Sequence, residues 1–536
     1  MTGIGANFAD HLDRAAAQWA QRDAVVFNDG RMSFRDVADG SRNVAASLLK
    51  LGVKKGDRVG IWLENGVPWV LSYWALARLG AIAVPFNTRW TASESRGVLR
   101  QIGLTAMVVG DCFRKVSFLE LLAEATDGEA SLLSLVITTA KEPPGGFSNF
   151  SDLTAQADAA SLAQVAYAQG QVTRDDVAQV QFTSGSTAFP KGAILRQGPM
   201  LDYVYGYGLR MGITSEDRLL CQMPFFHIAG INHAMLVPPV LGATLITADT
   251  FDPALAIRQI EQEDCTTMGA VSTMYFMMAD QPGVDRQVFR RIRKAWCLGS
   301  AQAVRRVHEL TGIDGLVSLY GCTEMSGGTT CGDVTDPLEL RLSNVGRPLP
   351  YVQTKIVDKD TGAPLPIGKT GEICHRSASL MSGYYALEVN QCAIDSDGWL
   401  HTGDLGALDD DGYLTYHGRH KDMLKVGGEN VACPEVEDVL SIHPAVRLAA
   451  VVGMPDARLE EVPVAFVELK SASGASETDL IAHCARLLAR FKVPRRIVVL
   501  EALPTTGSNK LDKTALKARA QQLGNAVEKS AIGEMG

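Results

Sequence analysis

The sequence predicts an α/β protein in which a large N-terminal domain of layered, largely parallel sheets precedes a small α+β C-terminal domain. The first observation is a strand, helix, strand order, in which RVGIWL and AIAVPF flank a helical pattern over residues 67–79. The second is the return of this alternation in ATLITA, a helix over residues 253–264 and TTMGAV. The third is a cluster of charge and glycine in GRHKDMLKVGG, residues 418–428, which marks a domain boundary.

Local signals predict the first elements. Ser33, with Asp36 three residues later, forms a capping box, and apolar residues continue at helical spacing until Gly52 ends the helix. The start of the chain, MTGIGANFADHLDRAAAQ, has the pattern of an amphipathic helix rather than of a signal peptide. Further on, an apolar pattern that includes Val177 and Phe182 predicts a short strand, which a hydroxyl-rich segment then breaks.

The C-terminal part has its own set of elements. We expect a helix from Glu435, the strands LAAVVG, VAFVEL and RRIVVL, and a helix over residues 479–490. The predicted domains are therefore residues 1–418 and 419–523, followed by a weakly patterned tail over residues 524–536 that frays.

Composition argues against several classes of protein. The 536 residues are 46% apolar and 21% charged, and the formal charge of −9 gives no footprint for a nucleic-acid partner. Ten cysteines are scattered without a CxxC pair or zinc-type spacing, which predicts reduced thiols and a cytoplasmic protein. The most apolar stretch, VLSYWALARLGAIAVPF, is interrupted by Arg78, Gly80 and Pro85, so we expect no membrane span.

The stretch QFTSGSTAFPKGAIL, residues 181–195, places hydroxyls, glycines and one lysine directly after a predicted strand. Glycines let the backbone approach phosphates, hydroxyls donate hydrogen bonds, and lysine supplies positive charge. Pro190 before the lysine breaks the P-loop pattern, so the segment is either a phosphate loop of another kind or a plain surface turn. The residues that would carry the chemistry are Thr183, Ser184, Gly185, Ser186, Thr187 and Lys191.

Further motifs follow this loop in a fixed order: PFFHIAG at Pro224, LGSA at Leu298, YGCTE at Tyr320, VGRPLP at Val345, HTGDLG at His401, GRHKDMLKVGGEN at Gly418 and PTTGSNK at Pro504. Together with FTSGSTAFPKGA, they resemble the signature of the adenylate-forming enzymes, the superfamily of acyl-CoA synthetases, nonribosomal peptide adenylation domains and firefly luciferase. The resemblance covers nearly the whole chain. It implies an ATP- and acyl-binding N-terminal domain with a β-rich subdomain, and a small mobile C-terminal cap.

The resemblance implies a two-step reaction that uses ATP, Mg²⁺ and CoA. A carboxylate first joins the α-phosphate of ATP, giving an acyl-adenylate and pyrophosphate, and a thiol then takes the acyl group while AMP leaves. The loop from Thr183 to Lys191 would hold the β- and γ-phosphates, Glu324 would hold magnesium, and Thr323 would lie beside the α-phosphate. An isolated loop carboxylate is ordinarily just solvated, and only the YGCTE context favours the metal role.

The nucleoside contacts come from four of the motifs. By resemblance, Asp404 would accept hydrogen bonds from both ribose hydroxyls, and Arg419 would add a charged donor. An aspartate beside glycine is otherwise a turn residue, and an arginine is otherwise a surface residue. The segments that would contact adenine contain Gly299, Ser300, Ala301, Tyr320 and Gly321, although a tight turn explains the first three equally well.

The remaining roles concern movement and the acyl group. Lys510 matches the lysine that reaches the carboxylate and the α-phosphate, and it would block the thiol unless the small domain swings. Lys421 occupies the hinge position, and Gly428 matches a glycine that lets the pantetheine arm pass. His227 would lie between the acyl pocket and the tunnel, although a histidine after two phenylalanines is otherwise a core or helix-capping residue.

Three positions depart from the family pattern. Ala188 and Glu460 stand where the family has glycine, and Asn509 replaces the glycine before the lysine. A left-handed backbone at Ala188 would cost about 1 to 2 kcal/mol, whereas asparagine tolerates that conformation better. These changes affect the expected mobility of the nucleotide loops rather than the fold.

The leading interpretation is an AMP-forming carboxylic acid:CoA ligase for a medium or long fatty acid or an alicyclic acid. An aryl-acid CoA ligase, an adenylating enzyme that loads a carrier protein, and a catalytically weak nucleotide-binding homologue stay open as alternatives. The expected partners are a small-molecule carboxylic acid, ATP and CoA, and a homodimer is one possible assembly.

Overall fold

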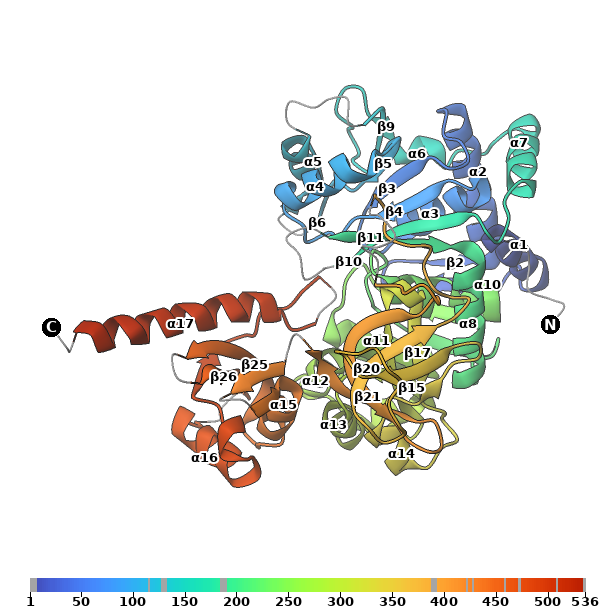
Figure 1. Ribbon diagram of the computed structural model, residues 1–536. Coiled ribbons are helices and arrows are strands. Elements are labelled where there is room, and N and C mark those ends of the chain that lie inside the picture. Colours follow the sequence, from blue (N-terminus) through green and yellow to red (C-terminus); the bar gives the residue numbers. More distant parts are fainter. Residues whose placement is uncertain are drawn as a thin grey trace.

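The computed structural model describes residues 7–113, 116–126, 133–183, 190–386, 393–420, 423–426, 429–456, 459–470, 474–507 and 510–533. Two large sheets form the N-terminal body, and a smaller unit that contains the C-terminal strands lies beside it (Figure 1).

A seven-stranded sheet forms the upper part of the molecule in Figure 1. Its strand order is β11-β10-β4-β3-β5-β8-β9, and every neighbouring pair is parallel except β10 with β11. The strands are β3 (Arg58–Trp62), β4 (Ile82–Pro85), β5 (Ala106–Val109), β8 (Leu135–Thr138), β9 (Ser148–Asn149), β10 (Val177–Thr183) and β11 (Lys191–Arg196). The helices of this part are α2 (Phe34–Lys50), α3 (Val67–Leu79), α4 (Ala92–Ile102), α5 (Phe118–Ala125), α6 (Phe150–Leu153) and α7 (Ala159–Gly170). Two short strands, β6 (Cys112–Phe113) and β7 (Val116–Ser117), pair antiparallel.

A nine-stranded sheet forms the second half of the body, with the order β18-β17-β16-β15-β14-β12-β13-β1-β2. Its central strands are parallel, which confirms the predicted α/β architecture. The strands are β1 (Asp23–Val26), β2 (Arg31–Ser33), β12 (Arg218–Leu220), β13 (Thr244–Ile246), β14 (Thr267–Val271), β15 (Lys294–Leu298), β16 (Leu316–Cys322), β17 (Gly327–Cys331) and β18 (Arg347–Pro348).

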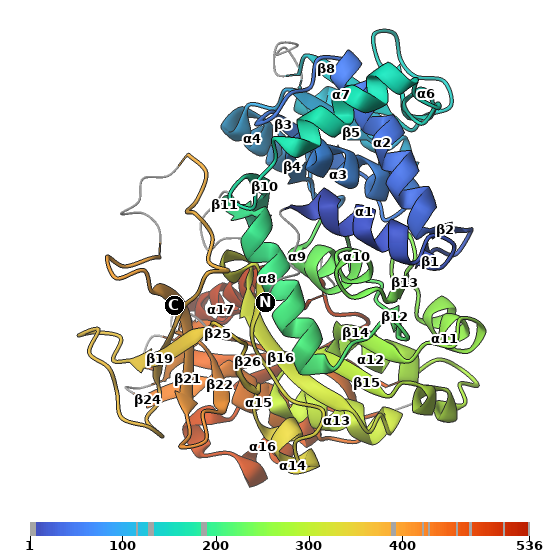
Figure 2. The ribbon, with the colours of Figure 1, turned by 90° about the vertical axis from the view of Figure 1, so that its right-hand side faces the viewer.

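The helices of this half include α8, which runs along the side of the sheet that faces the viewer in Figure 2. They are α1 (Phe8–Gln18), α8 (Gln197–Met211), α9 (Ile228–Gly230), the π-helix η2 (Ile231–Met235), α10 (Val237–Leu241), α11 (Pro253–Gln262), α12 (Ser272–Ala279), the 3₁₀ helices η3 (Arg286–Arg291) and η4 (Thr323–Met325), α13 (Ala301–Thr311) and α14 (Leu338–Ser343).

A four-stranded antiparallel sheet comes next, as expected for a β-rich subdomain, and consists of β19 (Gln353–Val357), β20 (Gly371–Arg376), β21 (Leu400–Leu408) and β22 (Leu414–Arg419). The C-terminal unit then adds a five-stranded sheet with its own apolar core. Its elements are β23 (Met423–Val426), β24 (Glu429–Ala432), α15 (Cys433–Ser441), β25 (Val446–Asp456), β26 (Glu460–Leu469), α16 (Glu477–Leu487), the 3₁₀ helix η7 (Arg490–Lys492), β27 (Arg496–Leu500) and α17 (Lys513–Gly533).

The C-terminal end differs from the sequence-based expectation. Helix α17 continues through most of the segment expected to be a weakly patterned tail, and in Figure 1 it points away from the body. Alanine, lysine, glutamine and leucine are strong helix formers, and they dominate Lys513–Gly533 enough to extend the helix without periodic patterning. The capping box of Ser33 and Asp36 is confirmed, and α3 has the predicted bounds.

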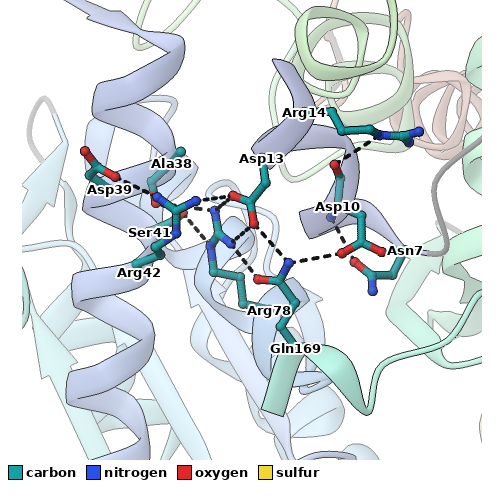
Figure 3. A network of polar contacts seen from close by, with 10 residues as sticks. All are labelled: Asn7, Asp10, Asp13, Arg14, Ala38, Asp39, Ser41, Arg42, Arg78 and Gln169. Carbon is teal, nitrogen blue, oxygen red and sulfur yellow. Dashed lines mark hydrogen bonds and ion pairs between the residues drawn. The ribbon is translucent and has the colours of Figure 1, made fainter. Parts of the chain in front are cut away.

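A buried charged network joins the helices α1, α2, α3 and α7 (Figure 3). Arg78 of α3 is fully buried, and its guanidinium donates to both carboxylate oxygens of Asp13, at 2.7 and 3.0 Å. Its other contacts are Ser41 Oγ at 3.0 Å and Gln169 Oε1 at 2.7 Å. Burial alone would raise the pKa of Asp13, but the contacts with Arg78, Gln169 and Arg42 together outweigh it and hold the pKa low.

Two further expectations concern cysteines and membranes. The cysteines in the described residues are all free thiols, and Cys112 is the only exposed one among them. None of the helices in the described part of the chain is long and apolar enough to cross a bilayer.

Candidate active site

A cavity of about 520 Å³ opens where the two large sheets, the four-stranded sheet and the loop before α17 meet. Much of its wall consists of the carboxyl ends of strands, which is where ligands bind in α/β sheets. The sequence-predicted residues that line this cavity together are Thr183, Lys191, His227, Gly321, Thr323, Glu324, Asp404, Arg419 and Lys510.

The two residues that flank the hydroxyl-rich segment, Thr183 and Lys191, line the cavity. Thr183 ends β10, Lys191 begins β11, and the two residues face each other in the antiparallel register. Thr183 Oγ1 donates to the Lys191 carbonyl at 3.4 Å. The predicted phosphate ligands Ser184, Gly185, Ser186 and Thr187, and the departing Ala188, lie outside the described residues.

Glu324 is held by a tyrosine that the motifs did not indicate. It lies in the 3₁₀ helix η4 after β16, and Tyr384 Oη donates to its Oε1 at 2.6 Å. The same tyrosine ring lies under the Lys191 ammonium, with Nζ 5.3 Å from the ring centre. Tyr384 therefore ties the lysine of the loop to the carboxylate of YGCTE. In the sequence, Tyr384 is an aromatic residue of the GYY segment after β20, and the sequence alone does not connect this segment to Lys191 or to Glu324.

Asp404 is a buried carboxylate in the middle of β21. Tyr320 Oη donates to its Oδ2 at 2.7 Å, and Arg419 Nε donates to its Oδ1 at 3.1 Å from the paired strand β22. Burial raises the pKa of Asp404, although the charge of Arg419 and the Tyr320 hydroxyl oppose the shift. The Asp404 carboxylate is therefore a hydrogen-bond acceptor held in place at the cavity wall, with the Arg419 guanidinium directly beside it.

His227 is placed by the start of a short helix. Its Nδ1 accepts the Ala229 N–H at 3.2 Å, so His227 is the N-cap of α9. Burial, the charge of Lys510 and the nearby His233 lower the pKa of His227 to about 3. The ring is therefore neutral near pH 7, and its proton is on Nε2, because Nδ1 is an acceptor. His227 offers the cavity a hydrogen-bond donor and not a positive charge.

Lys510 enters this cavity from the C-terminal unit. Thr506 N donates to the Lys510 carbonyl at 2.7 Å. Arg89 of the N-terminal body donates to the Thr506 carbonyl at 2.7 Å. Many protein atoms surround the Lys510 ammonium, but the side chain stays exposed to solvent because it lies in the open cavity. Burial and the charge of Arg419 lower the pKa of Lys510, and Asp404 opposes this shift.

The segments predicted to contact adenine are only partly at the cavity. Gly321 and Leu298 line it, whereas Gly299, Ser300, Ala301 and Tyr320 are not among the described residues of its wall. Ser300 instead caps the helix α13 and donates to Asp438 of the C-terminal unit at 2.6 Å. The adenine role of these residues stays a prediction.

Other predicted positions lie outside the cavity or outside the described residues. Lys421, Gly428 and Asn509 belong to the segments that the structure does not describe. Glu460, which replaces the family glycine, has φ of 66°, in the left-handed region that favours glycine. A Cβ at Gly507 would approach the side chain of Asn87 to 2.6 Å, so the lysine-bearing loop packs closely on the N-terminal body.

Comparison with known proteins agrees with this arrangement. Residues 12–385 match the family described as AMP-binding enzyme, and residues 435–510 match the AMP-binding enzyme C-terminal domain. The chain belongs to the AMP-binding enzyme family. Within it, the chain is an acid–thiol ligase of the acyl-CoA synthetase type, as the motifs predicted.

Similar relatives come from distant organisms. A mitochondrial medium-chain acyl-CoA ligase, ACSF2, from Danio rerio is 32% identical over 96% of this chain and 88% of its own. A Mycobacterium tuberculosis CoA ligase for a methyl-dioxo-octahydroindenyl propanoyl group is 34% identical over 94% of this chain and 97% of its own.

Solved structures give the same picture. The anthranilate CoA ligase AuaEII, in complex with anthranoyl-AMP, superposes with a TM-score of 0.85 at 26% identity, covering 98% of this chain and 99% of its own. ATP-bound MatB from Rhodopseudomonas palustris gives a TM-score of 0.84 at 25% identity, covering 97% and 100%. The predicted fold class is confirmed.

Proposed function

We propose that this chain is an AMP-forming ligase that activates a hydrophobic carboxylic acid with ATP and transfers it to the thiol of CoA. The observation that supports this most directly is that Lys510, Asp404 and Glu324 line one cavity although they come from three different parts of the chain. ATP is a substrate throughout the acyl-CoA ligases of this family, and CoA is the acceptor named for its relatives.

In the first step, a carboxylate oxygen of the acid attacks the α-phosphorus of ATP, and the bond to the bridging oxygen of pyrophosphate breaks. Two anions must approach, so positive charge at the reaction centre lowers the barrier. Lys510 would supply this charge from the C-terminal unit, and His227 Nε2–H would donate to the carboxylate. Thr183 and Lys191 would hold the leaving phosphates, and Asp404 with Arg419 would fix the ribose.

The residues at the cavity also fit a magnesium ion. The Glu324 carboxylate and the Thr323 hydroxyl are hard oxygen donors of the kind that Mg²⁺ prefers, and both line the cavity. Tyr384 orients the carboxylate from behind through its hydroxyl. When bound, the ion would offset the negative charge of the phosphates.

In the second step, the thiol sulfur of CoA attacks the acyl carbonyl, the bond to the phosphate oxygen breaks, and AMP leaves. Lys510 occupies the cavity in the orientation described above, so the C-terminal domain must rotate before the thiol can approach. Lys421 at the domain boundary would act as the hinge, and Gly428 would admit the pantetheine arm.

The acid would be apolar and of moderate size. The apolar residues of the cavity wall include Phe226, Ile228, Ala229 and Leu319, and the glycines of β17 also line it. Such a wall favours an aliphatic or alicyclic group over a charged one. The relatives that act on a medium-chain acid and on a bicyclic propanoyl group support the same class.

The test measures pyrophosphate release and AMP formation with CoA over aliphatic, alicyclic and aryl acids. We expect aliphatic or alicyclic acids to give the highest kcat/KM, whereas an aryl preference, as the likeness to an anthranilate ligase suggests, would favour the alternative acid class. Replacing CoA by a carrier protein tests the other acceptor. If no acid led to pyrophosphate release, the result would favour the alternative that the chain is a catalytically weak nucleotide-binding homologue.

Lys510→Ala tests the mechanism itself. We expect acyl-adenylate formation to fall by about 10²- to 10³-fold, while transfer from preformed acyl-adenylate to CoA continues. Lys517→Ala, on the helix that follows, is the matched control and should keep the parent rate. Acyl-adenylate formation by Lys510→Ala at the parent rate would contradict the proposed role.

A further inference from the structure

The C-terminal domain contacts the N-terminal body at a second place, apart from the cavity. There the end of α12 and the helix α13 face α15 and the start of β25. Ser300 Oγ donates to Asp438 Oδ1 at 2.6 Å, and Arg447 Nε lies 3.4 Å from Asp280 Oδ2. We call these contacts, together with those of Arg306 below, the docking face.

Arg306 makes the most specific contact of the docking face. From the middle of α13, its guanidinium donates to the Ser441 carbonyl and, at 3.2 Å, to the Val446 carbonyl. The group also lies over the ring of Phe276, with Cζ 5.1 Å from the ring centre. Both carbonyls belong to the C-terminal domain, and the supporting ring belongs to the N-terminal body.

The Ser441 carbonyl is a suitable target for this cation. Ser441 is the last residue of α15, and the final carbonyls of a helix lack partners within the helix. A positive group at this end also interacts favourably with the helix dipole. Arg306 therefore caps a helix of the other domain, which a residue of the same helix would ordinarily do.

The geometry of the contact depends on domain orientation. The two carbonyls lie at the end of α15 and the start of β25, and one planar guanidinium reaches both. A rotation of the C-terminal domain that withdraws Lys510 from the cavity would move both carbonyls away from Arg306. The contact and the placement of Lys510 thus belong to the same orientation.

We propose that Arg306 is a positioning residue that stabilises the domain orientation in which Lys510 reaches the cavity. It would support formation of the acyl-adenylate and have no part in transfer to the thiol. The inference rests on the proposed function, because it assigns Arg306 to one of the two half-reactions.

The experiment compares the two half-reactions in Arg306→Ala and Arg305→Ala. Arg305 is the neighbouring residue of α13, but it pairs with Glu339 of the same body at 2.8 Å, so it is a matched control. For Arg306→Ala we expect single-turnover acyl-adenylate formation to fall about 10- to 100-fold, the range for losing hydrogen bonds from a charged donor. Transfer from preformed acyl-adenylate to CoA should stay within about twofold, and Arg305→Ala should leave both steps unchanged.

An equal loss in both half-reactions, or no loss in either, would overturn the inference. Arg306→Lys keeps the charge without the planar fork and should give an intermediate loss of acyl-adenylate formation alone. This variant carries the same test if Arg306→Ala does not fold.

Amide hydrogen exchange over residues 433–446 adds a readout that needs no turnover. Exchange should be faster in Arg306→Ala and unchanged in Arg305→Ala, and equal rates in the wild-type protein and Arg306→Ala would refute the contact. If the wild-type protein released no pyrophosphate with any acid, the proposed function would fail while hydrogen exchange still tested Arg306.

Discussion

Asp438 of the docking face provides a pH-dependent test of domain docking. Its carboxylate is mostly buried between the domains, and burial raises its pKa from 3.8 to about 6, although the Ser300 hydroxyl opposes the shift. Glu437 and Glu435 add to the rise, and Lys513 opposes it. The perturbation is Asp438→Asn, which keeps an oxygen acceptor for Ser300 and removes the charge.

The sign follows from the raised pKa. Asp438 binds its proton more tightly when docked than when exposed, so its contribution to docking is fully present below its ordinary pKa of 3.8. That contribution is lost progressively as the pH rises from about 3.8 through about 6, and above that pH the charged carboxylate opposes docking by a constant amount. A rise of about two pH units corresponds to about 3 kcal/mol at most, and partial exposure to solvent reduces this to about 1 to 2 kcal/mol.

The assay is single-turnover acyl-adenylate formation by the Asp438→Asn variant, expressed as a ratio to the wild-type rate at each pH. The ratio cancels the titration of substrates and of other residues. We expect it to lie near one at or below about pH 4, to rise as the pH goes from about 4 to about 6, and to level off at about 5- to 30-fold above about pH 7. Glu339→Gln, which alters an exposed carboxylate of the N-terminal body, should give a ratio independent of pH. A flat or falling ratio for Asp438→Asn would refute the reasoning.

Three further changes test other contacts. Arg78→Met removes the buried partner of Asp13 and should lower the free energy of unfolding, measured in urea, by about 3 to 5 kcal/mol. Arg42→Ala, nearer the surface, should lower it by at most about 1 kcal/mol, and equal losses would show that burial does not decide how much an Asp13 partner stabilises the protein. Tyr384→Phe should raise the half-saturating Mg²⁺ concentration about 10- to 100-fold with little change in KM for the acid, and the opposite pattern would contradict its link to Glu324. Gly230→Ala would bring a Cβ to 2.1 Å from the Pro224 carbonyl oxygen, so the segment that carries His227 must shift. Acyl-adenylate formation should then fall about 100-fold, and an unchanged single-turnover rate would contradict this expectation.

Several elements could be predicted because their signals are local. The helix over residues 67–79 is predominantly apolar, with Pro68 in its first turn and Gly80 in the left-handed conformation at its end. The capping box at Ser33 lies within four residues. The same locality explains why the order of short motifs indicated the family, since each motif keeps its residues next to one another.

Contacts between distant segments could not be predicted from such local signals. Tyr384 lies 60 residues from Glu324 and Asp438 lies 138 residues from Ser300, and neither pair has a sequence signal that connects its members. Ser300 illustrates the difference, because its motif indicates a nucleotide contact while the structure places its hydroxyl against the other domain.

The sequence by itself determined the family, the two-domain α/β architecture and the chemical types gathered in the motifs, because apolar periodicity, caps and motif order are local properties of the chain. Only the tertiary structure decided that Lys510 shares a cavity with Asp404 and Glu324, that Tyr384 orients Glu324, and that Arg306 caps α15. These contacts depend on the orientation in which distant segments of the chain pack against one another. That orientation is set by packing over a whole interface, which the spacing of residues along the chain does not encode.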